Sequence, residues 1–149
     1  MERNNKSLLQ MVFSTGFSDT GILILRLVIG SCFVMHGYPK IMDGPEKWAM
    51  IGGAMKNVGI DFAPAFWGFC AAASEFFGGM ALIVGLLTRV AASGIAFTML
   101  IATVMHVTHG DGFEKFSHPL ELMTVGVLLI LSGAGKWSLD NLVFKKLEP

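Results

Sequence analysis

Four long apolar segments constrain this chain more than any other feature of its sequence. They cover approximately residues 21–38, 63–87, 90–107 and 119–134. A helix needs about 20 residues to cross a hydrocarbon core of about 30 Å, and these segments suit that length. Apolar residues occupy every face of the segments rather than one stripe, which is typical of a membrane span or a deep core. A chain of 149 residues is too short to bury four such helices in a soluble protein.

Composition supports the same interpretation. Hydrophobic residues make up 53% of the chain and charged residues 15%, whereas an average soluble protein has about 25% charged residues. Eleven basic residues balance eleven acidic ones, so the chain lacks the basic surplus that nucleic-acid binding requires. We therefore expect an all-α protein, a four-helix transmembrane bundle that forms a single domain over residues 1–149 and has the lipid bilayer as its partner.

The longest connection between the expected spans, residues 41–64, predicts a short extra helix. Pro45 and Glu46 begin an apolar stretch in this connection, and proline and an acidic residue both favour the first turn of a helix. Asn57 and Gly59 mark its end. A connection of this length is often functional or covers a site. We expect it to lie on the outer face of the bundle or to fold back over it.

The distribution of basic residues predicts the orientation in the membrane. Four spans place both termini on one side, together with the turn at Arg89, and that side collects six basic residues: Arg3, Lys6, Arg89, Lys136, Lys145 and Lys146. The opposite side has four: Lys40, Lys47, Lys56 and Lys115. Because Lys and Arg accumulate in cytoplasmic loops, we expect both termini in the cytoplasm.

Charged residues within the expected spans are the first candidates for a functional site. Arg26 and Glu75 lie inside the first and second spans, and Glu121 lies near the start of the fourth. A charge at mid-bilayer costs about 2.5–3.5 kcal/mol on insertion scales, so such residues usually face the bundle interior and pair. At 1.5 Å per residue, Arg26 and Glu75 lie about 21 and 16 Å below the outer edge. We therefore expect an ion pair between Arg26 and Glu75.

A second polar layer is expected nearer the outer edge. His36 and Lys40 are four residues apart and share a helix face, while His106 ends the third span and Glu121 begins the fourth. Convergent polar groups in an apolar interior suggest a binding site. The predicted ligand-binding or proton-relay residues are Arg26, His36, Lys40, Glu75, His106 and Glu121. A purely structural role, in which these groups hold the helices together, is the alternative.

Metal and haem chemistry have weaker support in the sequence. His109 and His118 flank a loop with two acidic residues, but the spacing matches no metal motif, and we predict no metal site. A b-type haem needs two facing histidines. His36 and His106 are the candidates at similar depth, and we do not favour that cofactor.

The two cysteines and the small residues of the second span are better explained by packing. Cys32 and Cys70 lie at depths that leave a contact between them open, but a free cysteine is commonly a small buried apolar residue. Cys70, Ser74 and Gly78 repeat at four-residue spacing, a pattern that lets membrane helices approach closely.

Several short motifs, in this order on four spans, resemble the DoxX family of small bacterial membrane proteins. They are Arg26-Leu-Val-Ile-Gly30, His36-Gly-Tyr-Pro-Lys40, Glu75-Phe-Phe-Gly-Gly79, Gly85-Leu-Leu-Thr-Arg89, His106 and Gly133-Ala-Gly-Lys-Trp-Ser-Leu-Asp140. The resemblance covers roughly residues 21–142. It implies a four-helix protein of the bacterial cytoplasmic (inner) membrane, and some relatives take part in quinone-linked redox chemistry, including a subunit of thiosulfate:quinone oxidoreductase.

Three hypotheses follow for the function. The first is a redox-associated membrane subunit, part of a quinone-linked oxidoreductase, that binds a quinone-like or small anionic molecule in its polar interior. The chain has no recognisable electron carrier of its own, so a membrane or soluble oxidoreductase partner is implied. The second is a non-enzymatic scaffold or assembly subunit of an oxidoreductase complex. Association of the chain with copies of itself, as a homo-oligomer, is a further alternative. The third is a small-solute transporter, for which the expected inverted repeat is not found.

Overall fold

The computed structural model describes residues 18–144, which contain helices and no strands. Four long helices form the body of this part of the chain: α2 (Asp19–Met42), α4 (Pro64–Val84), α5 (Thr88–Thr108) and α6 (Phe113–Ser132). Each of them is long and apolar enough to cross a membrane. The predicted all-α class with four transmembrane helices is therefore confirmed.

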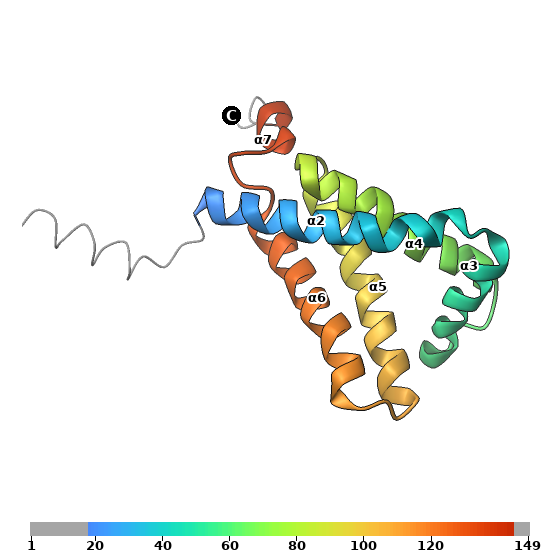
Figure 1. The fold of residues 1–149 in the computed structure, drawn as a ribbon. Helices are drawn as coiled ribbons and strands as arrows, with labels where there is room; N and C mark the ends of the chain where they lie inside the picture. Colours follow the sequence, from blue (N-terminus) through green and yellow to red (C-terminus); the bar gives the residue numbers. More distant parts are fainter. Residues whose placement is uncertain (1–17, 145–149) are drawn as a thin grey trace, which may run out of the picture.

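Shorter helices lie at the two ends of this bundle. The connection after α2 forms α3 (Pro45–Gly52) and the 3₁₀ helix η1 (Gly53–Val58), so the predicted extra helix is confirmed. We call residues 45–58 the cover. At the opposite end, α7 (Leu139–Phe144) follows α6. Figure 1 shows α3 and α7 at opposite ends of the molecule.

Two helices extend past prolines at which the sequence predicts a boundary. Helix α2 continues through Pro39 to Met42, and α6 begins at Phe113 with Pro119 inside it. Proline lacks an amide hydrogen and usually marks the start of a helix or the residue after its end. In a membrane, neighbouring helices and side chains satisfy the freed backbone groups, so internal prolines are tolerated.

The long helices pack in chain order, α2 on α4, α4 on α5 and α5 on α6. Helix α2 crosses the bundle obliquely, while α5 and α6 run in a different direction (Figure 1). Small residues make the contacts close. A Cβ atom added to Gly30 of α2 would meet the carbonyl oxygen of Gly79 at 2.8 Å, and one added to Gly94 of α5 would meet Ser74 Oγ at 3.0 Å. The small residues of α4 thus contact both neighbouring helices, as their spacing predicts.

Candidate functional site

The most deeply buried ion pair within residues 18–144 joins α2 to α4. The Lys40 ammonium lies 2.7 and 2.6 Å from the two carboxylate oxygens of Glu75. The Glu75 side chain is 2% exposed and the Lys40 side chain 33%. A buried carboxylate is strongly destabilising unless it is paired and hydrogen-bonded. Lys40 therefore neutralises Glu75, and the pair holds the end of α2 against the middle of α4.

The predicted pair between Arg26 and Glu75 is wrong. Lys40 and Arg26 are 14 residues apart on α2, which corresponds to about 21 Å along a helix. Because Lys40 contacts Glu75, Arg26 lies far from that carboxylate. The depth estimate assumed parallel helices with level ends, whereas α2 crosses the bundle obliquely (Figure 1).

Arg26 instead belongs to a second polar cluster at the α7 end of the bundle. Its side chain is fully buried, and its Nη2 donates a hydrogen bond to the carbonyl oxygen of Trp137. Its guanidinium lies against Gly85, where a Cβ atom would collide with Arg26 Nη1. Asp140 accepts hydrogen bonds from the amides of Leu87 at 2.7 Å and Thr88 at 2.9 Å. The segment after α6 is thereby fastened over the turn between α4 and α5.

Replacing Asp140 with alanine should loosen this fastening. The variant leaves two amides at the start of α5 without their acceptor, and losing a helix-capping side chain costs about 1–2 kcal/mol. Leu87 also holds a left-handed backbone conformation with φ of 49°, which the Asp140 carboxylate helps to maintain. We expect a lower melting temperature and faster tryptic cleavage after Lys136. Asp43→Ala, which removes an exposed carboxylate, is the control, and equal behaviour of the two variants would contradict this role.

The cover is fixed to three of the long helices. Trp48 Nε1 donates to the carbonyl oxygen of Lys40 at 2.8 Å, and its ring packs edge-on against Phe69 of α4 with centroids 5.0 Å apart. Thr108, the last residue of α5, donates to Asn57 Oδ1 at 2.9 Å. Trp48 therefore positions α3 beside the residue that neutralises Glu75.

A cavity of about 320 Å³ lies between the cover and helices α4 and α5, and we call it the cover cavity. Its size is at the lower end of the range of about 300–1,000 Å³ typical of ligand sites. Lys40 and Glu75 contribute to its lining. Most of the remaining wall is apolar, and it includes four methionines and a cysteine: Met50, Met55, Cys70, Met99 and Met105. Flexible, polarisable methionine side chains adapt to a ligand and make favourable contacts with aromatic rings.

Two of the residues that line the cavity carry hydrogen-bond donors with spare capacity. An ammonium group has three donor hydrogens, and Lys40 directs two of them to the oxygens of Glu75. Trp67 also lines the cavity, and its buried Nε1 has no hydrogen-bond partner among the described residues. An unpaired buried donor is rare in proteins, and the Trp67 side chain carries this one beside the cavity without exposing Nε1 on its surface. Trp67 is not among the site residues predicted from the sequence, because a tryptophan near the end of a membrane span is typical of the interface with water.

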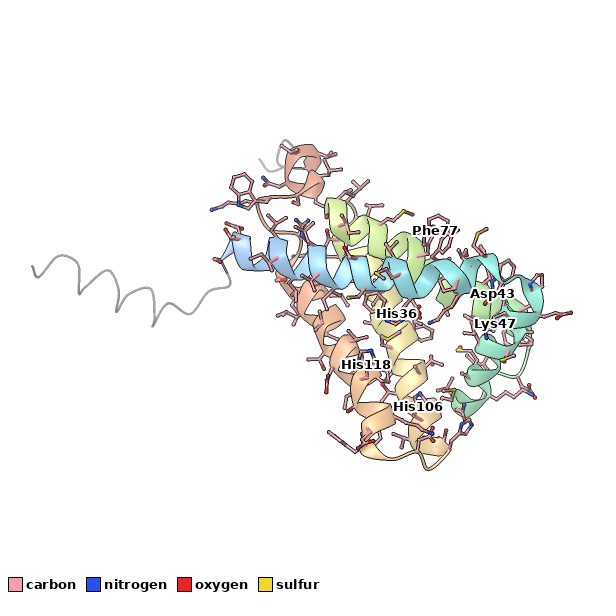
Figure 2. All side chains as sticks on the ribbon, viewed as in Figure 1. His36, Asp43, Lys47, Phe77, His106 and His118 are labelled. Carbon is pink, nitrogen blue, oxygen red and sulfur yellow. The ribbon has the colours of Figure 1, made fainter. Side chains whose placement is uncertain are left out.

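The other predicted site residues lie outside the cavity. His36 and Glu121 are exposed on α2 and α6, and His106 lies near the end of α5, away from His36 (Figure 2). His106 Nδ1 is 2.7 Å from Asp111 Oδ2, and Lys115 donates to the other oxygen of Asp111 at 2.9 Å. These residues fasten the turn between α5 and α6. The structure thus brings together two of the six predicted residues, Lys40 and Glu75.

Asp111 is outside the membrane-spanning helices and titrates abnormally. The hydrogen bond with His106, and to a smaller extent the one with Lys115, lowers the pKa of Asp111 from 3.8 to about 2. A carboxylate with a lowered pKa stabilises the folded state above its ordinary pKa, and that stabilisation is lost as the pH falls through the lowered value. The stabilisation that comes from the lowered pKa of Asp111 is therefore complete above about pH 4 and disappears towards pH 2.

Both cysteines are free, with Cys32 exposed on α2 and Cys70 partly buried at the cavity. Within residues 18–144, no group of three or more His, Cys, Asp or Glu side chains is arranged to hold a metal ion. The cavity therefore presents one ion pair, spare donors and sulfur-containing apolar walls.

Comparison with known proteins identifies the family. The family model described as DoxX matches residues 21–108. The chain is 31% identical over 133 residues to "Inner membrane protein YqjF" of Escherichia coli (strain K12), an alignment that covers 86% of this chain and 95% of that protein. It is 32% identical over 129 residues to "Putative oxidoreductase CatD" of Bacillus subtilis (strain 168), with 85% and 90% covered. No solved structure matches. With its four apolar helices, the chain is a multi-pass bacterial inner membrane protein that belongs to the DoxX family.

Proposed function

We propose that this protein is a redox-associated membrane subunit that binds the head group of a quinone in the cover cavity. The observation that carries the proposal is an apolar cavity of about 320 Å³ whose charged lining is one ion pair, Lys40 with Glu75. The name of the Bacillus subtilis relative, "Putative oxidoreductase CatD", agrees with a redox role.

Charge balance favours a neutral ligand over a small anion. The positive charge of Lys40 is matched by Glu75 at 2.6 Å, so the lining has no surplus positive charge to offset a buried anion. Burying an unmatched anion is costly. A quinone ring is neutral, planar and mostly apolar, which suits the methionine-rich walls.

The spare donors match the two carbonyl oxygens of a quinone. The third hydrogen of the Lys40 ammonium is available to one oxygen, and the unpaired Nε1 hydrogen of Trp67 becomes available to the other when the ring displaces the side chains that bury it. Reduction of a quinone to a quinol consumes two electrons and two protons. The Lys40 ammonium can donate one of these protons, water supplies the other through the Glu75 carboxylate, and an oxidoreductase partner supplies the electrons.

A cavity-filling variant tests the proposal. Ala102 lines the cavity, and Ala102→Phe should exclude the ring while leaving Lys40 and Glu75 intact. We expect wild-type protein in lipid nanodiscs to bind decyl-ubiquinone or a menaquinone analogue with quenching of tryptophan fluorescence, and the variant to lose at least tenfold in affinity. Val90→Phe on the exposed face of the same helix is the matched control.

Two results would contradict the proposal. Equal affinity of Ala102→Phe and wild type would place the ligand elsewhere. Absence of binding to either quinone, together with co-purification of a stoichiometric protein partner, would favour the scaffold alternative.

We further propose that the α7 end of the bundle faces the cytoplasm, which places the cover cavity towards the opposite side of the membrane. Of the ten basic residues other than Arg26, six belong to the side of the bundle that carries the termini. Basic residues accumulate on the cytoplasmic side of a membrane. A fusion of green fluorescent protein to the C-terminus should fluoresce, and a fusion of alkaline phosphatase there should be inactive. The reverse pattern would invert the orientation.

A further inference from the structure

The cover cavity has an opening whose position follows from the exposure of its wall. Among the residues that line it, two are exposed: Met50 of α3, at 71%, and Phe97 of α5, at 49%. A residue that both lines a cavity and has an exposed surface lies at the edge of the opening. The opening therefore lies between α3 and α5.

The packing of the helices agrees with this position. Helix α3 packs against α4 and η1, and η1 reaches α5, but α3 itself hardly contacts α5. The hydrogen bonds of Trp48 and Asn57 fix both ends of the cover, to α2 and to α5, so the cover forms one wall of the cavity.

Phe97 places the opening within the hydrocarbon region. It lies nine residues from the start of α5 and eleven from its end, or about 14 and 17 Å along the helix. Its exposed neighbours on the same helix include the apolar residues Val90 and Leu100, and the exposed Ser93 donates its hydroxyl hydrogen within the helix, to the carbonyl oxygen of Arg89. A half-exposed side chain at the middle of a membrane-spanning helix is surrounded by lipid. One edge of the opening therefore lies at mid-membrane.

We infer that the cover cavity opens sideways into the bilayer, between Met50 and Phe97, and takes its ligand from the lipid phase. The ligand class is a neutral amphiphile with an oxygen-bearing ring and a long apolar chain. The ring binds between Lys40 and Trp67, and the chain leaves past Phe97 along the apolar surface of α5. The identity of the ring rests on the proposed function, whereas the position of the opening does not.

Site-directed spin labelling tests the opening without any ligand. Single cysteines replace Met50 or Phe97 in a Cys32→Ser, Cys70→Ser background, and collisions with oxygen, which concentrates in lipid, are compared with collisions with a water-soluble nickel chelate. We expect a label at Phe97 to behave like one at Val90, the lipid-exposed reference, and unlike one at Lys115, the aqueous reference. A Phe97 label that is accessible to the nickel chelate at the level of Lys115 would overturn the lateral opening.

Ligand chain length provides the second test. At equal concentration in the lipid, decyl-ubiquinone should bind at least tenfold more tightly than the same ring without its chain, and Phe97→Trp should slow its association. Equal affinity of the two compounds would overturn the proposed path of the chain. If the spin labels report lipid but neither compound binds, the lateral opening stands and the quinone proposal fails. If both compounds bind but the Phe97 label reports water, the quinone proposal stands and the lateral opening fails.

Discussion

Replacing Gly68 with alanine should separate the cover from the bundle. Gly68 of α4 lies directly against the backbone of α3, and a Cβ atom there would collide with the carbonyl oxygen of Trp48. The same contact involves Gly52 of the cover, where a Cβ atom would collide with the carbonyl oxygen of Pro64. Backbone atoms cannot rotate away as a flexible side chain can, so α3 must move. Overpacking usually costs about 1–3 kcal/mol, and a backbone collision belongs at the upper end of that range or above it.

Gly68→Ala should change the structure around the cover as well as lower the stability of the protein. Displacing α3 breaks the hydrogen bond from Trp48 Nε1 to the carbonyl oxygen of Lys40. It also removes one wall of the cover cavity. We expect a clear drop in melting temperature, faster proteolysis within residues 45–58, and loss of quinone binding. These are measurable by thermal unfolding, limited proteolysis and fluorescence titration in nanodiscs.

Gly53→Ala is the matched control for this prediction. Gly53 is also in the cover, but a Cβ atom there would meet nothing within 4 Å, and its backbone φ of −57° suits any residue. Its alanine variant should be neutral or slightly more stable, because alanine restricts the unfolded chain. If Gly68→Ala behaved like Gly53→Ala, the close contact between α3 and α4 would not hold the cover in place.

The fold was largely predictable from the sequence because apolar length and composition determine membrane spans. The four helices and the short helix of the cover follow from segment length and from the proline at position 45. The helix ends at Pro39 and Pro119 were not predictable by the same rule. That rule describes helices in water, where freed backbone groups find solvent, whereas packed membrane helices keep such prolines inside.

The candidate site was predictable in its chemistry but not in its pairing. The free-energy cost of placing a charge inside the membrane correctly predicted that Glu75 is buried and paired with a cation. This argument does not identify the cation. It could not distinguish Arg26 from Lys40 as that cation, because the depth estimate equated distance along each helix with depth in the membrane. That equality holds only for parallel helices with level ends. The 24 residues of α2 exceed the number needed to span the bilayer, and a long span usually tilts. The span predicted from the sequence, residues 21–38, is shorter than α2, so this signal against level helix ends was not available before the structure.

Residues at helix ends were harder still to assign. The position of His106 near the end of a helix does not determine whether its side chain faces the bundle or the following turn. Its partner Asp111 follows five residues later in the chain. Local partners of this kind compete with long-range ones, and sequence distance alone does not decide between them. Glu121 shows the opposite problem, since it is exposed on α6 although a charge in a span is expected to face inward.

The two members of the Lys40–Glu75 pair should respond unequally to substitution. Lys40→Met leaves the Glu75 carboxylate buried at 2% exposure without its cation, and breaking a buried pair in this way costs about 3–5 kcal/mol. Glu75→Gln should cost less, about 1–3 kcal/mol for the weakened hydrogen bonds, because the Lys40 side chain is 33% exposed and its ammonium can turn outward. Thermal or denaturant unfolding of the two variants in the same detergent measures the difference. Equal losses would contradict the unequal burial.

The double variant Lys40→Met, Glu75→Leu separates fastening from function. Two apolar side chains of similar size replace the ion pair, and such replacements of a buried pair are often neutral or stabilising, so the double variant should recover most of the stability that Lys40→Met loses. It also removes one of the two spare donors and both proton-exchanging groups from the cavity wall. We therefore expect a folded protein with at least tenfold weaker quinone binding. Full recovery of both stability and binding would show that the pair only holds α2 to α4, whereas recovery of stability alone would make Lys40 and Glu75 part of the binding site.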